Sequence, residues 1–301
     1  MRIHEEVMPD SHNLYLASCF HFGTLQQHRK GVENLITQVE QDPTARLIFL
    51  GDFAEGITID DKRYSRETLD PSMPEPTLQY KEGTAFFKPI ADKIKGIHAG
   101  NHDLKIAPRY GNGIRDIVCA TIGGWSNRDG ESLYSGYNCK YTMVDKEGKK
   151  MYKLFATHGF KSVNSSEQDD YKRYLALGKR LRSILEPMAG DCEIMAMGHT
   201  HKLIVIPPIP SIHEQHVSPK LYLTDDGKEI KQHYIHQKHM DNPDYIDGNK
   251  RWYANVGCFF KLFGHNMDSY AETKGYPPTE MGYVVVRVED RQVKNIERVV
   301  I

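Results

Sequence analysis

The segments LIFLGD at residues 47–52 and IHAGNHD at residues 97–103 share one plan: an apolar run that ends in glycine and polar side chains. Short apolar runs bounded by glycine are typical of buried strands. Three further segments follow this plan, namely LYLASCFHFG (14–23), KLFATHG (153–159) and IMAMGHTH (194–201). In open α/β sheets, ligands bind at the carboxyl ends of the strands. We therefore expect these polar clusters to meet at one site.

The segments around these strands predict helices and a hairpin. Apolar residues recur at helical spacing over residues 32–39 and 171–185, and residues 85–94 are also expected to be helical. Residues 141–144 and 152–156 flank Asp-Lys-Glu-Gly, which is a hairpin signal. Strands that alternate with helices and are followed by hairpins indicate an α/β sandwich with mixed sheets.

Composition limits the class of protein. The chain has 301 residues, of which 39% are hydrophobic and 26% charged, which excludes a disordered or fibrous protein. The net charge of −1 argues against a protein that coats nucleic acid by bulk electrostatics. We expect a single domain over residues 1–301 with an insertion or extended hairpin at about residues 202–250, where periodicity weakens and basic and acidic residues mix.

Cysteine usage and hydropathy predict a cytoplasmic protein. The 5 cysteines are scattered and form no CxxC pair, so neither a disulfide framework nor a zinc ribbon is expected. The polar, acidic start of the chain is unlike a signal or transit peptide. The apolar runs are far shorter than the ~20 residues of a membrane helix, so we expect no membrane partner.

The strand-end clusters supply His, Asp and Asn, whose nitrogen and oxygen donors suit divalent Mn, Fe or Zn. The two carboxylate oxygens of Asp52 could bridge two ions. Each motif alone has a structural alternative, since Gly-Asp after a strand is commonly a turn and Asn101-His102-Asp103 could cap a helix. The ordered set of Gly-Asp, Gly-Asn-His-Asp, Thr-His-Gly and Gly-His-Thr-His is much harder to explain by chance and indicates a metal site.

In this order the motifs resemble those of the calcineurin-like metallophosphoesterase superfamily, whose pattern is DxH, GD, GNH(D/E), H and GHxH. The resemblance runs from Ser18 to His201 and extends to residues 255–258, which are similar to an Asn-Gly-Ser turn of that family. It implies a four-layer α/β/β/α sandwich of two mixed sheets. It also implies a dinuclear site for divalent Mn, Fe, Zn, Ni or Co, with Mn favoured.

The resemblance implies a role for each matched residue. The implied ligands are His21, Asp52 and His201 for the first metal and Asp52, Asn101, His158 and His199 for the second, with Asp52 bridging. A hydroxide between the ions would attack phosphorus in line. His102 would act near the leaving group as a general acid or transition-state clamp, and Asp103 would orient it.

Cys19 departs from the family pattern, which has Asp two residues before the first His. Three interpretations stay open. Cys19 is a thiolate ligand and favours a softer ion such as Zn or Fe; or it is not a ligand, and the first metal is held weakly by the remaining residues; or the first site is lost. The second is favoured, because a decayed site would have lost several ligands and a buried Cys is also a small hydrophobic residue.

The loops set the substrate, and the candidates are residues 54–76, 108–135, 161–170 and 202–250. The second of these carries cations and aromatic side chains that could clamp a phosphate and stack a base, namely Arg109, Tyr110, Arg115, Trp125 and Arg128. The leading hypothesis is a phosphodiesterase acting on nucleic acid or a nucleotide, because protonation by His102 would help a poor alkoxide leaving group. The alternatives are a phosphomonoesterase, such as a protein or small-molecule phosphatase, and a catalytically silent scaffold.

Overall fold

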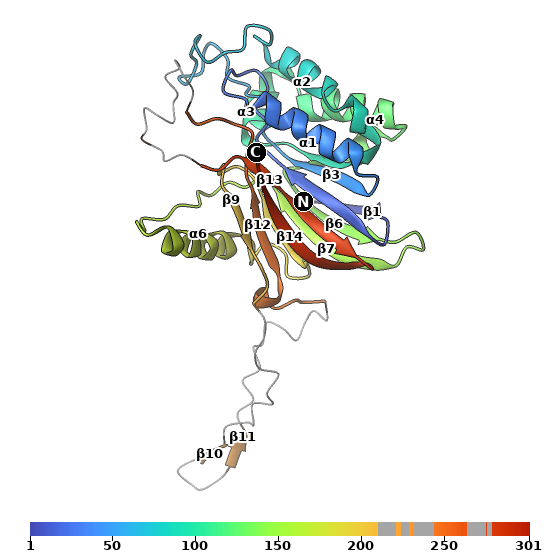
Figure 1. Ribbon diagram of the computed structural model, residues 1–301, viewed down its shortest axis with the longest axis vertical. Helices are drawn as coiled ribbons and strands as arrows, with labels where there is room; N and C mark the ends of the chain where they lie inside the picture. Colours follow the sequence, from blue (N-terminus) through green and yellow to red (C-terminus); the bar gives the residue numbers. More distant parts are fainter. Residues whose placement is uncertain (210–220, 224–228, 232–243, 264–274, 276–278) are drawn as a thin grey trace.

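The computed structural model describes residues 1–209, 221–223, 229–231, 244–263, 275 and 279–301. Within these residues the chain is a mixed α/β protein with two six-stranded mixed sheets (Figure 1). The first sheet has the strand order β14-β13-β2-β3-β4-β5. Its strands are β2 (His12–Ala17), β3 (Ala45–Leu50), β4 (Ile94–His98), β5 (Tyr134–Gly136), β13 (Gly282–Glu289) and β14 (Gln292–Val300). Strands β2 to β5 run parallel, whereas β13 is antiparallel to both β2 and β14.

The second sheet has the order β1-β6-β7-β8-β12-β9. Its strands are β1 (Arg2–Val7), β6 (Asn138–Val144), β7 (Lys150–Thr157), β8 (Ile194–Met197), β9 (Leu203–Ile206) and β12 (Trp252–Val256). Strands β7, β8 and β12 are parallel to one another, and β6 and β7 form the predicted antiparallel hairpin. The hairpin turn is closed by Asp145, whose Oδ1 accepts backbone N–H groups from Glu147 and Lys149 at 2.9 and 2.8 Å.

The helices agree with the predicted ones in two places and differ in two others. Helices α1 (Arg29–Gln41) and α6 (Asp170–Leu185) contain the two predicted apolar stripes. The expected helix at residues 85–94 is instead α2 (Pro76–Ala85) followed by the 3₁₀ helix η1 (Lys88–Lys93). The segment 108–135, expected to be a loop, is largely helical: it begins in the last turn of α3 (Asn101–Tyr110) and contains the π-helix η2 (Ile114–Cys119), α4 (Ala120–Ser126) and α5 (Gly130–Leu133).

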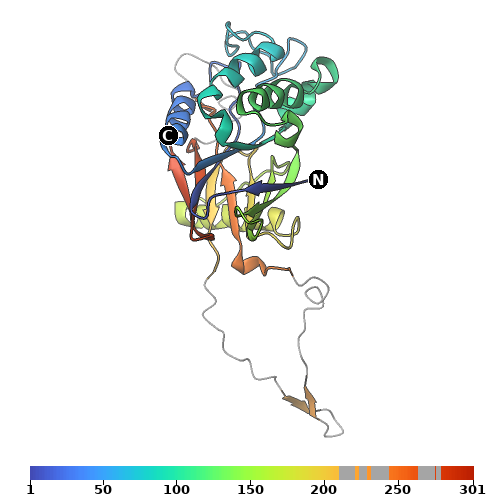
Figure 2. The ribbon, with the colours of Figure 1, turned by 90° about the vertical axis from the view of Figure 1, so that its right-hand side faces the viewer.

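The apolar side chains form three clusters. Successive residues of β2 point to opposite faces of the sheet, so Tyr15 enters the cluster that contains α1 residues and Leu14 enters the cluster shared with the second sheet. The third cluster lies between the second sheet and α6, where Leu181 meets Phe155 and Met195. Figures 1 and 2 show α1 to α4 grouped on one side of the strands and α6 on another.

The region at about residues 202–250 is described only in part. It begins with β9, and it includes β10 (Leu221–Leu223) and β11 (Glu229–Lys231), which pair antiparallel with each other. The 3₁₀ helix η4 (Gly248–Lys250) closes it. Residues 210–220, 224–228 and 232–243 lie outside the described residues, so the expected insertion and its mixed charge stay a prediction.

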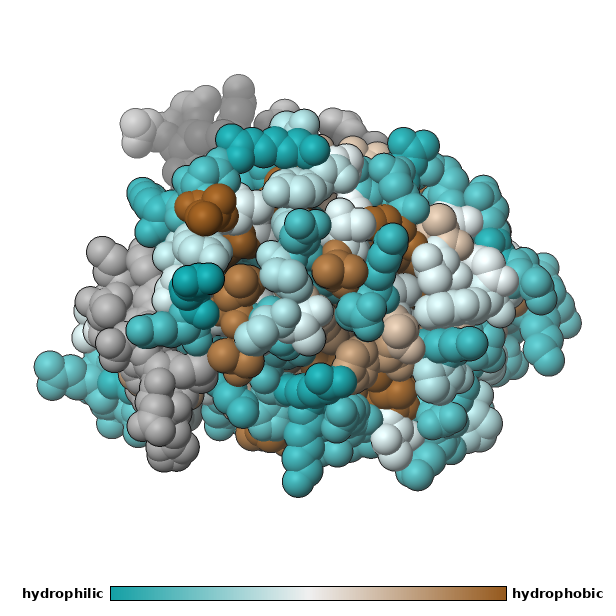
Figure 3. Space-filling view, turned by 90° about the horizontal axis from the view of Figure 1, so that it is seen from above, coloured by the Kyte–Doolittle hydropathy of each residue, from teal (hydrophilic) through white to brown (hydrophobic). Residues whose placement is uncertain are grey.

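No helix in the described part of the chain is long and apolar enough to cross a membrane. On the face seen from above, hydrophilic side chains predominate and apolar ones occur in small separate patches (Figure 3).

A buried histidine lies between the sheets at the end of β4. The side chain of His98 is fully buried, with its Nε2 2.9 Å from the Tyr141 hydroxyl and its Nδ1 3.4 Å from the carbonyl oxygen of Tyr137. Burial lowers the pKa of His98 to about 3 from the usual 6.5. The imidazole therefore stays neutral in the folded protein at pH values where it is charged in the unfolded chain.

We expect His98 to make the fold sensitive to acid. Between pH 6.5 and about 3, His98 binds a proton in the unfolded chain but not in the folded protein. The free energy of unfolding therefore decreases as pH falls through this window. Between pH 6.5 and 5 the loss due to His98 is about 2 kcal/mol, at roughly 1.4 kcal/mol per pH unit. Urea unfolding at both pH values should show a smaller loss for His98→Gln. Equal losses in the two proteins would contradict the assignment.

Candidate metal centre

The polar clusters follow strands of both sheets and lie together. Those after β2, β3 and β4 come from the first sheet, and those after β7 and β8 come from the second. Several contacts join the sheets at this point; for example, His158 Nε2 lies 3.1 Å from Asp52 Oδ2, and His21 Nε2 lies 3.2 Å from His201 Nε2. The structure thus brings together side chains that are up to 180 residues apart in the sequence.

The backbone at this site adopts a conformation that L-residues rarely take. Left-handed φ angles occur at Cys19 (56°), His21 (51°), Asp52 (51°), His199 (68°) and His201 (54°). Only three other non-glycine residues in the described ranges have a positive φ. Such residues cost of order 1–3 kcal/mol each and concentrate at functional sites. The left-handed backbone at both His199 and His201 explains how both histidines of Gly-His-Thr-His reach the same site.

Close packing of glycines holds Asp52 in place. A Cβ at Gly100 would lie 2.1 Å from Asp52 Oδ1 and 2.2 Å from its backbone nitrogen, so only glycine fits there. The preceding Gly51 has a φ of +89° and packs against Gly100. The first turn of α3 approaches the carboxylate, with the backbone N–H of His102 donating to Asp52 Oδ1 at 2.9 Å. A helix N-terminus favours a negative charge at that position.

Asp52 lies between two groups of donor atoms. Its side chain is 2% exposed, and its Oδ2 lies 3.1 Å from His158 Nε2 and 4.0 Å from His21 Nε2. Burial alone would raise the pKa of Asp52, but the imidazoles of His158 and His102 hold it well below its usual value. The carboxylate is therefore an anion with one group of imidazoles on each side.

One group of donor atoms lies around Asn101, which follows β4 of the first sheet and contacts two histidines that follow strands of the second sheet. Its Oδ1 lies 2.9 Å from His158 Nε2 and 2.7 Å from His199 Nδ1. His158 donates its Nδ1–H to the carbonyl oxygen of Leu50 at 2.7 Å, and its Nε2 faces the oxygens of Asp52 and Asn101. Although burial lowers the pKa of His158, the Asp52 carboxylate raises it above its usual value, so a proton on Nε2 lies between these atoms until a metal ion replaces it. Lone pairs that converge in this way repel one another unless a proton or a cation lies between them. This donor set therefore fits a divalent ion.

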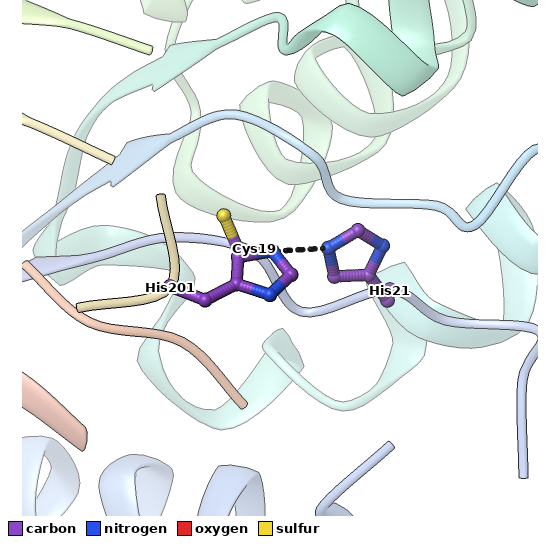
Figure 4. A group of neighbouring side chains, drawn as sticks. All are labelled: Cys19, His21 and His201. Carbon is purple, nitrogen blue, oxygen red and sulfur yellow. Dashed lines mark hydrogen bonds between the residues drawn. The ribbon is translucent and has the colours of Figure 1, made fainter. Parts of the chain in front are cut away.

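The other group consists of Cys19, His21 and His201 (Figure 4). The two imidazoles face each other through their Nε2 atoms, and one donor atom from each of the three residues lies within 4.8 Å of the others. His21 Nδ1 lies 2.7 Å from a carboxylate oxygen of Glu55. A histidine whose Nδ1–H donates to a carboxylate presents Nε2 as a ligand, so this group also fits a metal ion.

Cys19 lies where both groups meet. It is fully buried and also falls within 4.8 Å of donor atoms of Asp52 and His158. Burial, reinforced by the Asp52 carboxylate, raises the pKa of the Cys19 thiol well above its usual value. The thiol is therefore protonated in the metal-free protein, and a neutral thiol is a poor ligand compared with a thiolate.

Asp103, which was expected to orient His102, makes its hydrogen bonds in the described part of the chain to other groups. Asp103 is the third residue of α3, and its carboxylate turns back to accept the backbone N–H of Gly100 at 2.8 Å and the hydroxyl of Tyr80 at 2.9 Å. It therefore caps the helix. His102 instead donates its Nδ1–H to the backbone carbonyl of Glu55 at 2.5 Å.

Glu55 contacts the proposed site but was missed by the sequence reasoning. It contacts both His21 and His102, and its side chain is 12% exposed. Burial would raise its pKa, but the two imidazoles lower it, so Glu55 is a second anion beside the donor groups. Its position only three residues after Asp52 was the one feature of the sequence that placed it near the site. A lone Glu in a loop does not reveal which side chains it contacts.

A cavity of about 380 Å³ opens beside His21 and His102. Its wall includes residues from the candidate loops 54–76 and 161–170, together with Lys202 and the unanticipated Phe260 and Leu262. None of the five cationic and aromatic residues singled out in 108–135 lines it. The three arginines among them are held elsewhere, since Arg109 pairs with Asp60, Arg115 with Glu131 at 2.6 Å and Arg128 with Glu6 at 2.8 Å.

Comparison with known proteins identifies no family: no family model matches the sequence, and no curated protein matches it either.

Proposed function

We propose that the chain is a metal-dependent phosphoesterase of the calcineurin-like metallophosphoesterase type. The observation that carries this proposal is the position of the Asp52 carboxylate between two groups of buried and half-buried imidazole donors at the strand ends of both sheets. The three apolar clusters support the further proposal of a four-layer α/β/β/α sandwich, since each cluster would fill one space between adjacent layers.

The residues that would hold the ions follow from the two donor groups. The first ion would be held by His21, Asp52 and His201, and the second by Asp52, Asn101, His158 and His199. We favour Mn²⁺ and treat Cys19 as a non-ligand that leaves the first ion weakly held. Two bound divalent ions would supply Lewis acidity toward the phosphate oxygens and a water molecule of lowered pKa.

The chain's own residues orient the ester and move a proton. His102 is held by its Nδ1–H bond to Glu55, which directs Nε2 toward the cavity. The carboxylates of Asp52 and Glu55 raise the pKa of His102 despite its burial, so its imidazolium form is stabilised. A proton on Nε2 can then pass to the leaving alkoxide, which helps most with the poor leaving group of a diester.

This geometry favours a phosphodiester, either a nucleotide or a nucleic-acid strand, as substrate. The cavity is within the size range of small-molecule sites, and the apolar side chains of Ile57, Phe260 and Leu262 are suited to the organic part of an ester. All five cysteines are free, which is in keeping with our proposal of a cytoplasmic location.

The proposal is tested with purified protein loaded with Mn²⁺ or Zn²⁺ and assayed on bis(p-nitrophenyl) phosphate and p-nitrophenyl phosphate. We expect turnover of the diester, loss of turnover after chelation, and recovery when metal is returned. Faster turnover of the monoester would instead favour a phosphomonoesterase. No turnover of either ester, together with no bound metal by elemental analysis, would leave only a silent scaffold.

A further inference from the structure

Arg63 lies on the loop between β3 and α2 and lines the cavity beside His102. Its side chain is 26% exposed, so the guanidinium is partly withdrawn from solvent but can still be reached. The proposed catalytic and metal-binding residues do not include it.

Asp61 fixes the guanidinium from one side. Arg63 donates from Nε to Asp61 Oδ1 at 3.3 Å and from Nη2 to Asp61 Oδ2 at 3.0 Å, while its backbone N–H donates to Oδ1 at 3.0 Å. Asp61 Oδ2 also accepts from Lys105 Nζ. The side-chain hydrogen bond from Arg63 keeps the pKa of Asp61 far below its usual value, so the pair is ionic. Such two-point contacts set the plane of the guanidinium.

The opposite edge of the guanidinium faces the proposed site. Arg63 Nη1 lies 3.3 Å from His102 Nε2. Because His102 donates its Nδ1–H to Glu55, its Nε2 accepts from Arg63 only while the ring is neutral, and the imidazolium form that would protonate the leaving group cannot make this contact. An Arg side chain has five N–H groups, and these contacts engage three of them. The others have no recorded partner in the part of the chain that the structure describes.

We propose that Arg63 binds a non-bridging phosphate oxygen of the substrate, with Asp61 as its positioning residue. The proposal rests on the proposed function and adds to it the residue that holds the ester. The oxygen takes a charge-assisted hydrogen bond from Nη1, and the 3.3 Å contact to His102 is exchanged for this stronger one. His102 Nε2 is then free of the guanidinium, so it can take up a proton from solvent and pass it to the leaving group. The planar, fixed fork of Arg suits this task better than the flexible ammonium of Lys.

Binding of inorganic phosphate, measured by titration calorimetry with metal-loaded and chelator-treated protein, tests the assignment. We expect Arg63→Ala to weaken phosphate binding about 10- to 100-fold, as the loss of one charge-assisted hydrogen bond implies. Arg63→Lys and Asp61→Asn should weaken phosphate binding less than Arg63→Ala does. Arg63→Lys keeps the positive charge, and Asp61→Asn keeps the guanidinium but removes the carboxylate that fixes its orientation. With active protein, the KM for the diester should rise in the same order.

The matched control is Arg66→Ala, which removes the same charge from an exposed residue of the same loop that does not line the cavity. Phosphate binding in this variant should stay within about twofold of the unmodified protein. Equal affinities of Arg63→Ala and Arg66→Ala would overturn the assignment, and if Arg63→Ala does not fold, equal affinities of Arg63→Lys and Arg66→Ala would do so. Because calorimetry needs no turnover, a protein that cleaves neither ester but loses phosphate binding in Arg63→Ala would refute the phosphoesterase and not the anion site.

Discussion

Replacing Asp52 with Asn is expected to abolish tight binding of both metals and to lower diester turnover about 10³-fold or more, equivalent to about 4 kcal/mol of transition-state stabilisation. The Asp52 carboxylate lies between the two donor groups, and His158 and His21 both face its Oδ2. Asn is the appropriate replacement because it tolerates the left-handed backbone found at this position, where φ is 51°. Elemental analysis of the purified variant and a diester assay measure the two effects.

The control for this variant is a buried aspartate away from the site. Asp145 is 3% exposed, pairs with Arg291 and closes the β6–β7 turn. Asp145→Asn should therefore lower stability but leave metal content and turnover per folded molecule unchanged. If the Asp52→Asn protein still binds two ions and turns over the diester normally, the proposed metal centre is wrong.

The second large effect is expected at Cys19. Cys19→Asp should tighten binding of the first metal roughly 100-fold, or about 2.7 kcal/mol, because a carboxylate replaces a neutral thiol beside His21 and His201. Asp also tolerates the left-handed φ of 56° at this position. Without metal, the same variant should be less stable than the unmodified protein, since a second buried carboxylate then lies close to Asp52. Metal titration and thermal unfolding with and without chelator measure both changes.

The matched control is Cys139→Asp, which buries a carboxylate in β6 at a fully buried position outside the donor groups. It should be destabilised in the same way, but added metal should not restore its stability. If Cys19→Asp instead weakens metal binding or abolishes turnover, Cys19 is a thiolate ligand, and the interpretation of a weakly held first ion is wrong.

The positions of the strand-end clusters could be predicted from the sequence because each depends on local features. An apolar run such as residues 47–50 must be buried, and the glycine and polar residues that follow must lie where the strand stops. The predicted strands and the stripes of α1 and α6 were confirmed for this reason. The helices between residues 101 and 133 were missed, because Pro108 and several glycines interrupt the apolar periodicity there.

Which side chains touch at the site was decided only by the tertiary structure. The sequence places Asp103 next to His102, yet the carboxylate of Asp103 turns into the first turn of α3, and the backbone of Glu55 holds His102 instead. Arg63 reaches His102 only because the long loop after β3 folds back over the cavity. Spacing along the chain determines which residues end a strand, because that is a local property. Contact between side chains depends on packing between distant segments, which local sequence patterns do not encode.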